Sequence, residues 1–259
     1  MIEHELESLM DAVTEEGGRA GGPLLITAAT EREIAQLVRE TGGVPAGGNE
    51  PRPVWECEFA GHRLVMAITG IGKVNAASAV TSLVARYQPS LIINTGCGGA
   101  YPESGIRVGE LAIATAEIYG DEGVLTADGW HSLELIGIPS VERRGCRYAN
   151  EFPLSLEAAQ KAFQLGMSLN LPIRRGKFVT VSTCSGTTVR GAELFRRFGG
   201  ICENMEGAAV AHVALLYRVD ALELRGISNM VEDRDLSRWD IPLAAEMAQR
   251  FLLKYLENY

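Results

Sequence analysis

A carboxylate at position 206 is the first candidate for chemistry in this chain. It lies in the stretch Asn-Met-Glu-Gly of residues 204–207, and the apolar run 208–216 follows at once. That run is rich in Ala and Leu and lacks Gly and Pro, which predicts a buried helix. A carboxylate that opens such a helix lies near the positive end of the helix dipole and keeps its charge. For a lone Glu, a helix-terminal charge is the simplest interpretation.

Two features favour a ligand at this stretch. Met205 offers a soft apolar face next to Glu206. A second polar cluster, Arg-Gly-Ile-Ser-Asn at 225–229, follows after the length of one helix and one strand. In an open α/β sheet this spacing places both clusters at neighbouring strand ends, where ligands bind.

A second carboxylate, Glu33, follows the first apolar strand, predicted at 23–29. Thr30 with Glu33 three residues later is a capping-box pattern for a helix that continues through Val38. The alternative is a carboxylate at the C-terminal end of the strand, facing the ligand crevice. The local sequence alone favours the cap.

Glycines follow two further predicted strands. The strand at 91–95 runs into Gly96, Gly98 and Gly99, which predicts a turn that exposes backbone N–H groups to a flat ligand. A tight turn without a ligand is the alternative. Residues 70–73 read Gly-Ile-Gly-Lys, which matches neither a Walker A nor a dinucleotide fingerprint. We expect the glycines at 70 and 72 to let the backbone pass close to a ligand or to the next strand.

Small hydroxyl residues at 183–188 end a strand predicted at 177–182 and offer donors and acceptors for a polar heterocycle. The alternative is an N-cap cluster for a helix that begins near Gly191. Asp121 and Glu122 lie in a polar loop predicted at 120–130, and we interpret them as solvated loop residues rather than metal ligands. Glu203 is interpreted as part of a charged turn.

Composition limits the partners. A net charge of −9 argues against a nucleic-acid partner, which requires a basic face. Five cysteines without a CxxC pair indicate free thiols in a reducing cytoplasm, and no zinc spacing is present. The acidic N-terminus does not resemble a signal peptide, and the apolar runs are too short to span a bilayer. We therefore expect a cytoplasmic protein with no membrane association and no metal, and we expect no cofactor.

Strands that alternate with helices predict an α/β fold, namely a single-domain three-layer αβα architecture with a mostly parallel twisted central sheet. Residues 1–22 form an N-terminal extension, flexible or a short helix, in which Leu6, Leu9, Met10 and Val13 have helical spacing. Residues 23–259 form the catalytic domain. Further helices are predicted at 156–165 and 242–256, a hairpin at 55–69 that turns at Gly61, strands at 109–117 and 221–225, and irregular structure at 132–150.

Taken together, five stretches resemble the nucleoside phosphorylase and nucleosidase superfamily over residues 23–257. They are 29–33 (Ala-Thr-Glu-Arg-Glu), 70–74 (Gly-Ile-Gly-Lys-Val), 94–99 (Asn-Thr-Gly-Cys-Gly-Gly), 204–207 and 225–229. The pattern at 182–187 and the closing Ile-Ser-Asn at 227–229 are similar to the branch that hydrolyses nucleosides with an elaborated 5′ group. The resemblance implies a homo-oligomer that acts on a small-molecule nucleoside substrate.

The resemblance also implies the site residues. Glu206 binds the ribose hydroxyls, with Met205 packed on the sugar. Glu33 holds and deprotonates the attacking water, helped by Arg225. The substrate-binding set is completed by residues that line the base: Cys97, Gly98, Gly99, Gly186 and Thr187.

Asn229 is where this chain departs from family nucleosidases that act on adenine nucleosides, which carry Asp at this position. A 6-amino purine needs a proton at N7, whereas a 6-oxo purine presents acceptors at both N7 and O6. The Asn amide has two N–H donors for these acceptors, which indicates a hypoxanthine nucleoside. The wrong base would leave buried polar groups unpaired, at about 1–3 kcal/mol per group.

Two alternatives remain. Related hexameric phosphorylases have Arg in place of Asn94 and Ser in place of Cys97, so this chain lacks those phosphate ligands, and hydrolysis is favoured over phosphorolysis. A nucleoside sensor without activity would not need Glu33. The ligands of the 5′ group are open, with Arg190, Thr188 and His131 as candidates.

Overall fold

The structure is a computed structural model that describes residues 21–47, 52–143 and 145–259. The predicted short helix within residues 1–20 lies outside the described part. Among the described residues, no helix is both long enough and apolar enough to cross a bilayer.

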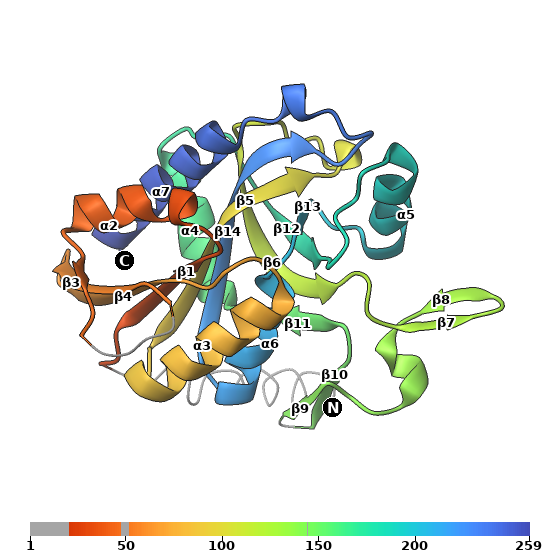
Figure 1. Cartoon of the computed structure of the whole chain (residues 1–259), viewed down its shortest axis with the longest axis horizontal. Helices are drawn as coiled ribbons and strands as arrows, with labels where there is room; N and C mark the ends of the chain where they lie inside the picture. Colours follow the sequence, from red (N-terminus) through yellow and green to blue (C-terminus); the bar gives the residue numbers. More distant parts are fainter. Residues whose placement is uncertain (1–20, 48–51, 144) are drawn as a thin grey trace, which may run out of the picture.

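A large twisted sheet forms the middle layer (Figure 1). Its strand order is β11-β6-β12-β13-β5-β1-β4-β3-β2, and β14 pairs with both β5 and β6. The strands are β1 (Leu24–Ala28), β2 (Val44–Pro45), β3 (Val54–Phe59), β4 (His62–Ile68), β5 (Leu91–Ala100), β6 (Leu111–Tyr119), β11 (Glu151–Pro153), β12 (Ile173–Thr180), β13 (Cys202–Asn204) and β14 (Asp220–Met230).

Parallel pairings form the middle of this sheet, where β1 lies between β4 and β5 and β14 runs alongside β5. β12 is also parallel to its neighbours β6 and β13. The predicted, mostly parallel sheet is confirmed, and the remaining pairings in it are antiparallel. One cause is the predicted β3–β4 hairpin, which turns with positive φ at Ala60 and Gly61. The other is the length of β5 and β14, which continue until they meet β13 and β6 in the opposite direction.

Helices cover both faces and complete the predicted α/β three-layer architecture. Figure 1 shows α2 (Ala35–Thr41), α4 (Leu156–Ser168) and α7 (Ile241–Glu257) on one side of the sheet, and α3 (Lys73–Tyr87) with α6 (Gly207–Tyr217) on the other. The predicted helix at 208–216 is buried over nearly its whole length, as its composition indicated. The remaining helix, α5 (Thr188–Phe198), begins three residues earlier than predicted because Thr187 caps it.

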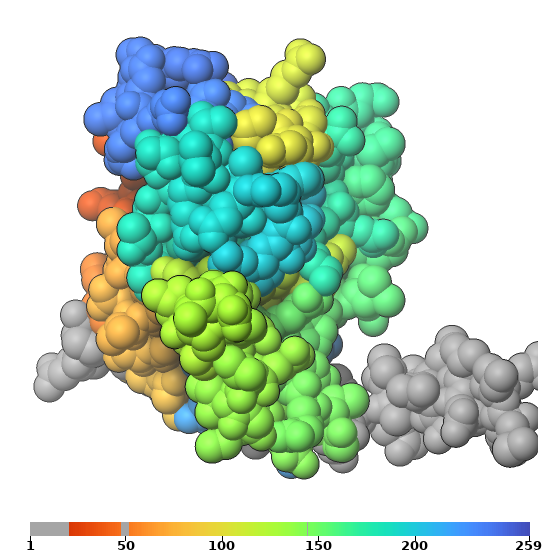
Figure 2. All heavy atoms as spheres, turned by 90° about the vertical axis from the view of Figure 1, so that its right-hand side faces the viewer, coloured from red at the N-terminus to blue at the C-terminus, as the bar shows by residue number. Residues whose placement is uncertain are grey.

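Two small antiparallel ribbons occupy the regions predicted as loop and irregular structure. They are formed by β7 (Val124–Thr126) with β8 (Gly129–His131), and by β9 (Val141–Arg143) with β10 (Cys146–Tyr148). Figure 2 shows this part of the chain gathered below the segment around α5. Short 3-10 helices complete the chain: η1 (Glu31–Glu33), η2 (Pro102–Ser104), η3 (Leu133–Ile136) and η4 (Leu236–Arg238).

The predicted turn at the glycines was wrong, because β5 continues through Gly96, Gly98 and Gly99 to Ala100. In the same way, residues 225–229 lie inside β14 and do not follow its end. The short strands β11 and β13 were not predicted. Three residues are too few to show an alternating pattern.

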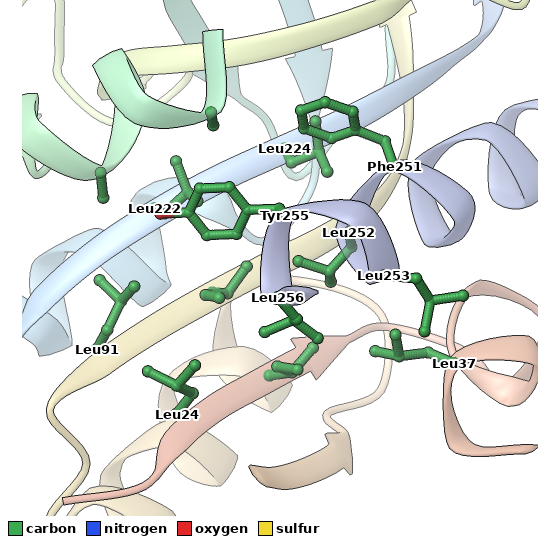
Figure 3. Packing of buried hydrophobic residues seen from close by; sticks show 14 of the residues in the cluster. Leu24, Leu37, Leu91, Leu222, Leu224, Phe251, Leu252, Leu253, Tyr255 and Leu256 are labelled. Atoms are coloured by element: carbon green, nitrogen blue, oxygen red, sulfur yellow. The ribbon is translucent and has the colours of Figure 1, made fainter. Parts of the chain in front are cut away.

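The C-terminal helix α7 packs its apolar side onto the middle of the sheet. Figure 3 shows Phe251, Leu252, Tyr255 and Leu256 against the strand residues Leu24, Leu91, Leu222 and Leu224. These side chains belong to one hydrophobic cluster that also reaches α2 and α4. This packing holds β1, β5 and β14 together, and those strands carry Arg225 and lead into Glu33.

We expect Leu252→Ala to lower the free energy of unfolding by about 2–5 kcal/mol, because it leaves a cavity in this cluster. Leu156→Ala is the matched control. Its side chain at the start of α4 is 74% exposed, so we expect a change of about 0.5 kcal/mol or less. Denaturant unfolding followed by circular dichroism measures both, and equal losses would contradict the packing described here.

Candidate active site

Arg225 is the buried centre of the site, with about 1% of its surface exposed. Its Nε and Nη2 donate to Glu223 Oε1 at 2.9 and 2.8 Å. Nη1 donates to the carbonyl oxygen of Cys97 at 3.1 Å, and Nη2 lies 3.4 Å from Glu206 Oε2. Residues 223 and 225 are two apart on β14, so their side chains point to the same face of the sheet.

Glu33 follows β1, and its position fits both predicted roles, as a capping residue and as a carboxylate that faces the ligand crevice. The capping box is confirmed, because Glu33 Oε2 accepts from the Thr30 amide at 2.9 Å and lies 2.7 Å from the Thr30 hydroxyl. The predicted continuous helix is divided, since η1 ends at Glu33 and α2 begins at Ala35. The other carboxylate oxygen accepts from the Cys97 amide at 2.8 Å. The cap therefore fixes the carboxylate at β5.

Gly96 lets Glu33 and Arg225 approach the same point of β5. A Cβ at position 96 would lie 2.5 Å from Glu33 Oε1 and 2.9 Å from Arg225 Nη1, and the φ of Gly96 is +151°. Any larger residue would displace one of these two side chains. The two predicted site residues are thus brought side by side.

Glu206 precedes α6, but its carboxylate does not bond to the amides of that helix. It accepts instead from the amide of Gly72 at 3.0 Å and contacts Arg225. Burial raises the pKa of Glu206, while the Arg225 charge and the Gly72 N–H act in the opposite direction. Arg225 and the Gly72 amide, rather than the dipole of α6 alone, therefore favour the negative charge of Glu206.

The glycines at 70 and 72 have φ angles of +86° and +91°, which accounts for glycine at both positions, and the amide of Gly72 reaches the segment that carries Glu206. The expected close approach of another segment is not the cause, because a Cβ on Gly72 would meet nothing within 4 Å. Lys73, the next residue, is not available for a phosphate. Its ammonium group contacts Asp121 Oδ1 at 2.7 Å and Glu122 Oε1 at 2.8 Å. The interpretation of these two acids as solvated loop residues was therefore wrong.

Asn229 is half-buried near the end of β14. Its Oδ1 lies 2.8 Å from the Ser228 hydroxyl, and its Nδ2 donates to the Met230 carbonyl at 3.1 Å. One of the two amide hydrogens is thus already used, and one remains for a ligand. A Cβ on Gly99 would lie 3.0 Å from Nδ2, so the amide rests against the backbone of β5.

Protein atoms fill the space around Gly98 and Gly99. A Cβ on Gly98 would collide with Cys202, and one on Gly99 would lie 3.0 Å from Val231 Cγ2. Close packing with β13 and β14 therefore accounts for glycine at both positions. The sequence interpretation, which favoured a ligand as the cause, missed this packing.

Residues 182–187 form the loop that the sequence singled out after β12. Cys184 Sγ lies 3.2 Å from Met205 Sδ, which joins this loop to the segment before Glu206. The Gly186 carbonyl accepts from the Arg234 amide at 3.2 Å, so the segment after Asn229 is also attached. Thr187 caps α5 by accepting from Arg190, which confirms the alternative interpretation of this residue.

The candidates for the 5′ group already have partners inside the protein. Arg190 pairs with Glu193 at 2.9 Å, and Thr188 exchanges hydrogen bonds with Asp233. His131 bonds to Thr126 within the β7–β8 ribbon. None of these contacts adds to the assignment of a 5′ ligand.

Sequence reasoning missed several buried polar residues behind the site. Glu203 was wrongly interpreted as part of a charged turn: it is buried in β13, and its carboxylate accepts from the amide of Ser185 and contacts the hydroxyl of Tyr101. Asn94 bridges Thr27 and Glu223 at 3.0 and 3.1 Å. Glu117 and Glu223 lie on β6 and β14. The sequence signal that could have identified Glu117 and Glu223 is a single acidic residue inside an otherwise apolar strand segment.

The comparisons with known proteins identify the family of this chain. A model of the phosphorylase superfamily matches residues 23–257. The futalosine hydrolase of Thermus thermophilus is 36% identical over 171 residues, 66% of this chain and 71% of that protein. The 5′-methylthioadenosine/S-adenosylhomocysteine nucleosidase of Bacillus thuringiensis is 31% identical over 81% of this chain and 89% of its own length.

Solved structures show the same fold. The 5′-methylthioadenosine/S-adenosylhomocysteine nucleosidase of Neisseria meningitidis matches with a TM-score of 0.78 at 22% identity, covering 92% of this chain and all of that one. The corresponding enzyme of Streptococcus pneumoniae matches with a TM-score of 0.77 at 25% identity, covering 91% of this chain and 98% of that one. These relatives are hydrolases and nucleosidases by name, and the chain described here belongs with them to the phosphorylase superfamily.

Proposed function

We propose that this nucleosidase hydrolyses the N-glycosidic bond of futalosine and releases hypoxanthine, a step of menaquinone biosynthesis. The relative from Thermus thermophilus supports the substrate, while relatives of similar identity act by name on methylthioadenosine and adenosylhomocysteine. The observation that carries the choice is Asn229, an amide with one free N–H where an adenine nucleosidase would have an acid.

In the proposed reaction the sugar binds at Glu206. N-glycosidic cleavage develops positive charge on the ribose, and a fixed carboxylate close to the sugar stabilises that charge. The Gly72 amide and Arg225 hold the Glu206 carboxylate in one orientation, and Met205 beside it provides the apolar contact to the sugar.

Glu33 is the proposed general base for the attacking water. Its carboxylate is held from two sides, by Thr30 and by the Cys97 amide, and Arg225 lies next to it. A base that is already oriented reduces the cost of placing the water. Arg225 then contributes positive charge as the water loses its proton.

We favour water over phosphate as the nucleophile because residues 94 and 97 carry no positive charge and Lys73 is already paired. Asn94, where hexameric phosphorylases have Arg, bonds to Thr27 and Glu223 inside the sheet. Burial, together with the Glu33 charge, raises the pKa of Cys97 to about 12, so its thiol stays neutral. Lys73 pairs with two acids.

The purine base of the substrate is the proposed partner of Asn229, Gly98, Gly99, Gly186 and Thr187. The Ser228 hydroxyl beside Asn229 Oδ1 turns the Nδ2 donor toward Gly99. With one amide hydrogen bonded to Met230, the other is available to N7 or O6 of a 6-oxo purine. The contacts from Gly186 and Thr187, like the other substrate contacts, are part of this proposal.

A location in the cytoplasm and a homo-oligomeric state stay predictions. All five cysteines are free thiols, which supports a reducing compartment. Exposed apolar residues at the start of α3, Ile71 and Val74, lie close to the Gly72 amide that holds Glu206, and sedimentation analysis would decide whether a second copy covers them.

The direct test is release of hypoxanthine from futalosine and from inosine, each with and without inorganic phosphate. We expect rapid release from futalosine that does not depend on phosphate, and slow release from inosine. Strict phosphate dependence would identify a phosphorylase. No release from any nucleoside would favour a binding protein, and equal rates on both substrates would reject futalosine as the preferred one.

We expect Glu33→Gln to lower kcat by at least about 100-fold, because the amide cannot accept the proton of water. Futalosine should still bind with nearly unchanged affinity in calorimetry. Glu31→Gln is the control, since Glu31 is an exposed acid in the same short helix and should retain wild-type kcat. Turnover by Glu33→Gln close to that of the wild type would show that another group activates the water.

We expect Asn229→Asp to shift the ratio of kcat/KM between futalosine and its 6-amino analogue by about 10–100-fold toward the 6-amino compound, because the acid can protonate N7 of a 6-amino purine but repels O6. Asn170→Asp is the matched control, at an exposed position distant in sequence from the site. An unchanged ratio in Asn229→Asp would remove position 229 from base recognition.

A further inference from the structure

Two acids, Glu117 on β6 and Glu223 on β14, lie buried next to each other directly behind the site. Both approach Gly207, the first residue of α6. A Cβ at that position would collide with Glu117 Oε1 and lie 2.6 Å from Glu223 Oε1. Two ionised carboxylates this close in a dry interior repel each other strongly.

The positive charge available to this pair is limited. Arg225 bonds directly to Glu223 and also contacts Glu206, and its guanidinium lies beside Glu33. One guanidinium therefore serves several buried carboxylates. Glu117 has only neutral hydrogen-bond partners among the described residues, namely Thr180 and Asn204.

The hydrogens around Thr180 show which form Glu117 takes. Thr180 Oγ1 lies 2.7 Å from Glu117 Oε2 and 3.0 Å from Asn204 Oδ1, and it also accepts from the Ala208 amide at 2.7 Å. A hydroxyl has a single hydrogen. If Glu117 is ionised, one of the two oxygen–oxygen contacts has no hydrogen between its atoms. If Glu117 carries a proton on Oε2, it donates to Thr180, and Thr180 donates to Asn204.

We propose that Glu117 is a neutral carboxylic acid in the folded protein and that it acts as a positioning residue for Glu206. The assignment of Glu206 to the sugar rests on the proposed function, whereas the protonation of Glu117 does not.

The connection to Glu206 runs through Asn204. Glu117 Oε1 accepts from Asn204 Nδ2 at 2.8 Å, which turns Asn204 Oδ1 toward the start of α6. That oxygen accepts from the amides of Glu206 and Gly207 at 3.0 and 2.7 Å. With the Ala208 amide bonded to Thr180, three consecutive amides around the start of α6 are held by this network. Glu117 thus fixes the backbone from which the Glu206 side chain extends.

The polar and titratable groups that face Glu117 come from three neighbouring strands and from its own strand, while β11 places the apolar Phe152 opposite it. They are Glu223 and Arg225 on β14, Asn204 and Cys202 on β13, Thr180 on β12, and Tyr119 on its own strand. Burial raises the pKa of Glu117 well above its ordinary value of 4.5, and the Glu223 charge adds to the effect. Ionisation of Glu117 at high pH would place two like charges together and break the contact chain to Glu206.

Glu117→Gln tests the proposal because the amide copies a protonated acid. Its Nε2 can donate to Thr180 while its Oε1 accepts from Asn204. The variant cannot ionise, so its stability should lack one pH-dependent contribution. Glu142→Gln, an exposed acid on β9, is the control.

The sign of the pH effect follows from proton binding. Above pH 4.5 the unfolded chain loses the Glu117 proton while the folded protein keeps it, so rising pH favours unfolding until the folded pKa is passed. In this window we expect the folding constant of the wild type to fall by about tenfold per pH unit relative to Glu117→Gln. The control should follow the wild type. Parallel curves for the wild type and Glu117→Gln, or a Glu117→Gln protein that does not fold, would contradict the proposal.

Infrared spectroscopy gives a readout that needs no substrate. The wild type at neutral pH should show a protonated-carboxyl C=O band that shifts on deuteration and is missing in Glu117→Gln. Absence of such a band in the wild type would overturn the proposal. If the wild type does not cleave futalosine, the proposed function fails, yet these two measurements still decide the state of Glu117.

The positioning role has its own kinetic test. At neutral pH we expect Glu117→Gln to keep kcat within about threefold of the wild type, and to lose less of it at alkaline pH. Glu117→Ala, which cannot direct Asn204, should lose kcat by about tenfold or more even where it remains folded. Retention of wild-type kcat by folded Glu117→Ala, or identical alkaline losses in the wild type and Glu117→Gln, would show that Glu117 does not position Glu206.

Discussion

One buried guanidinium organises this protein. Arg225 is enclosed by the sheet and contacts Glu223 and Glu206 directly, while Glu33 lies beside it. A buried charge without a partner is strongly destabilising, so the acids around Arg225 are a requirement of the fold as well as of the site. The burial of Arg225 also explains why β14 and β5 run so far together, since its contacts lie on both strands.

The glycines of β5 and of the segment before α3 follow from this arrangement. Gly96 leaves room for two charged side chains at one point of the strand. Gly72 presents its amide to an acid that comes from the other half of the chain. A Cβ at Gly96 would collide with those side chains, whereas the space where a Cβ of Gly72 would lie is open, and glycine is favoured there by its φ of +91°.

The sequence was sufficient for the class of fold, for most helices and for the acids that carry the proposed chemistry. The helix at 208–216 was recognised from its apolar composition, and the helix at 242–256 from its amphipathic pattern. Glu33 and Glu206 were singled out because each stands at the boundary between an apolar segment and the next element, and their roles stay predictions. The separate roles of Asn94, Glu117 and Glu223 were not found, because each depends on a side chain from another strand.

The errors have a related cause. Three glycines in four positions indicated a turn, but the atoms that fill the space around them come from β13, β14 and the segment at Glu33, far away in sequence. Asp121 and Glu122 were interpreted as solvated because Lys73, their partner, is nearly fifty residues earlier. Local patterns describe a residue's own element well, and they say little about what that element packs against.

The capping box formed by Thr30 and Glu33 has a consequence for the evolution of this protein. One oxygen of the Glu33 carboxylate is oriented by the amide and hydroxyl of Thr30, through a motif that closes within four residues, and the other accepts from the Cys97 amide of β5. Because the capping box is local, its hydrogen bonds are kept when distant segments of the chain rearrange. Loops around the proposed site can therefore change, and admit nucleosides of a different shape, while the Glu33 carboxylate keeps its position. This separation between the loops and the acid makes the fold easy to adapt to new substrates.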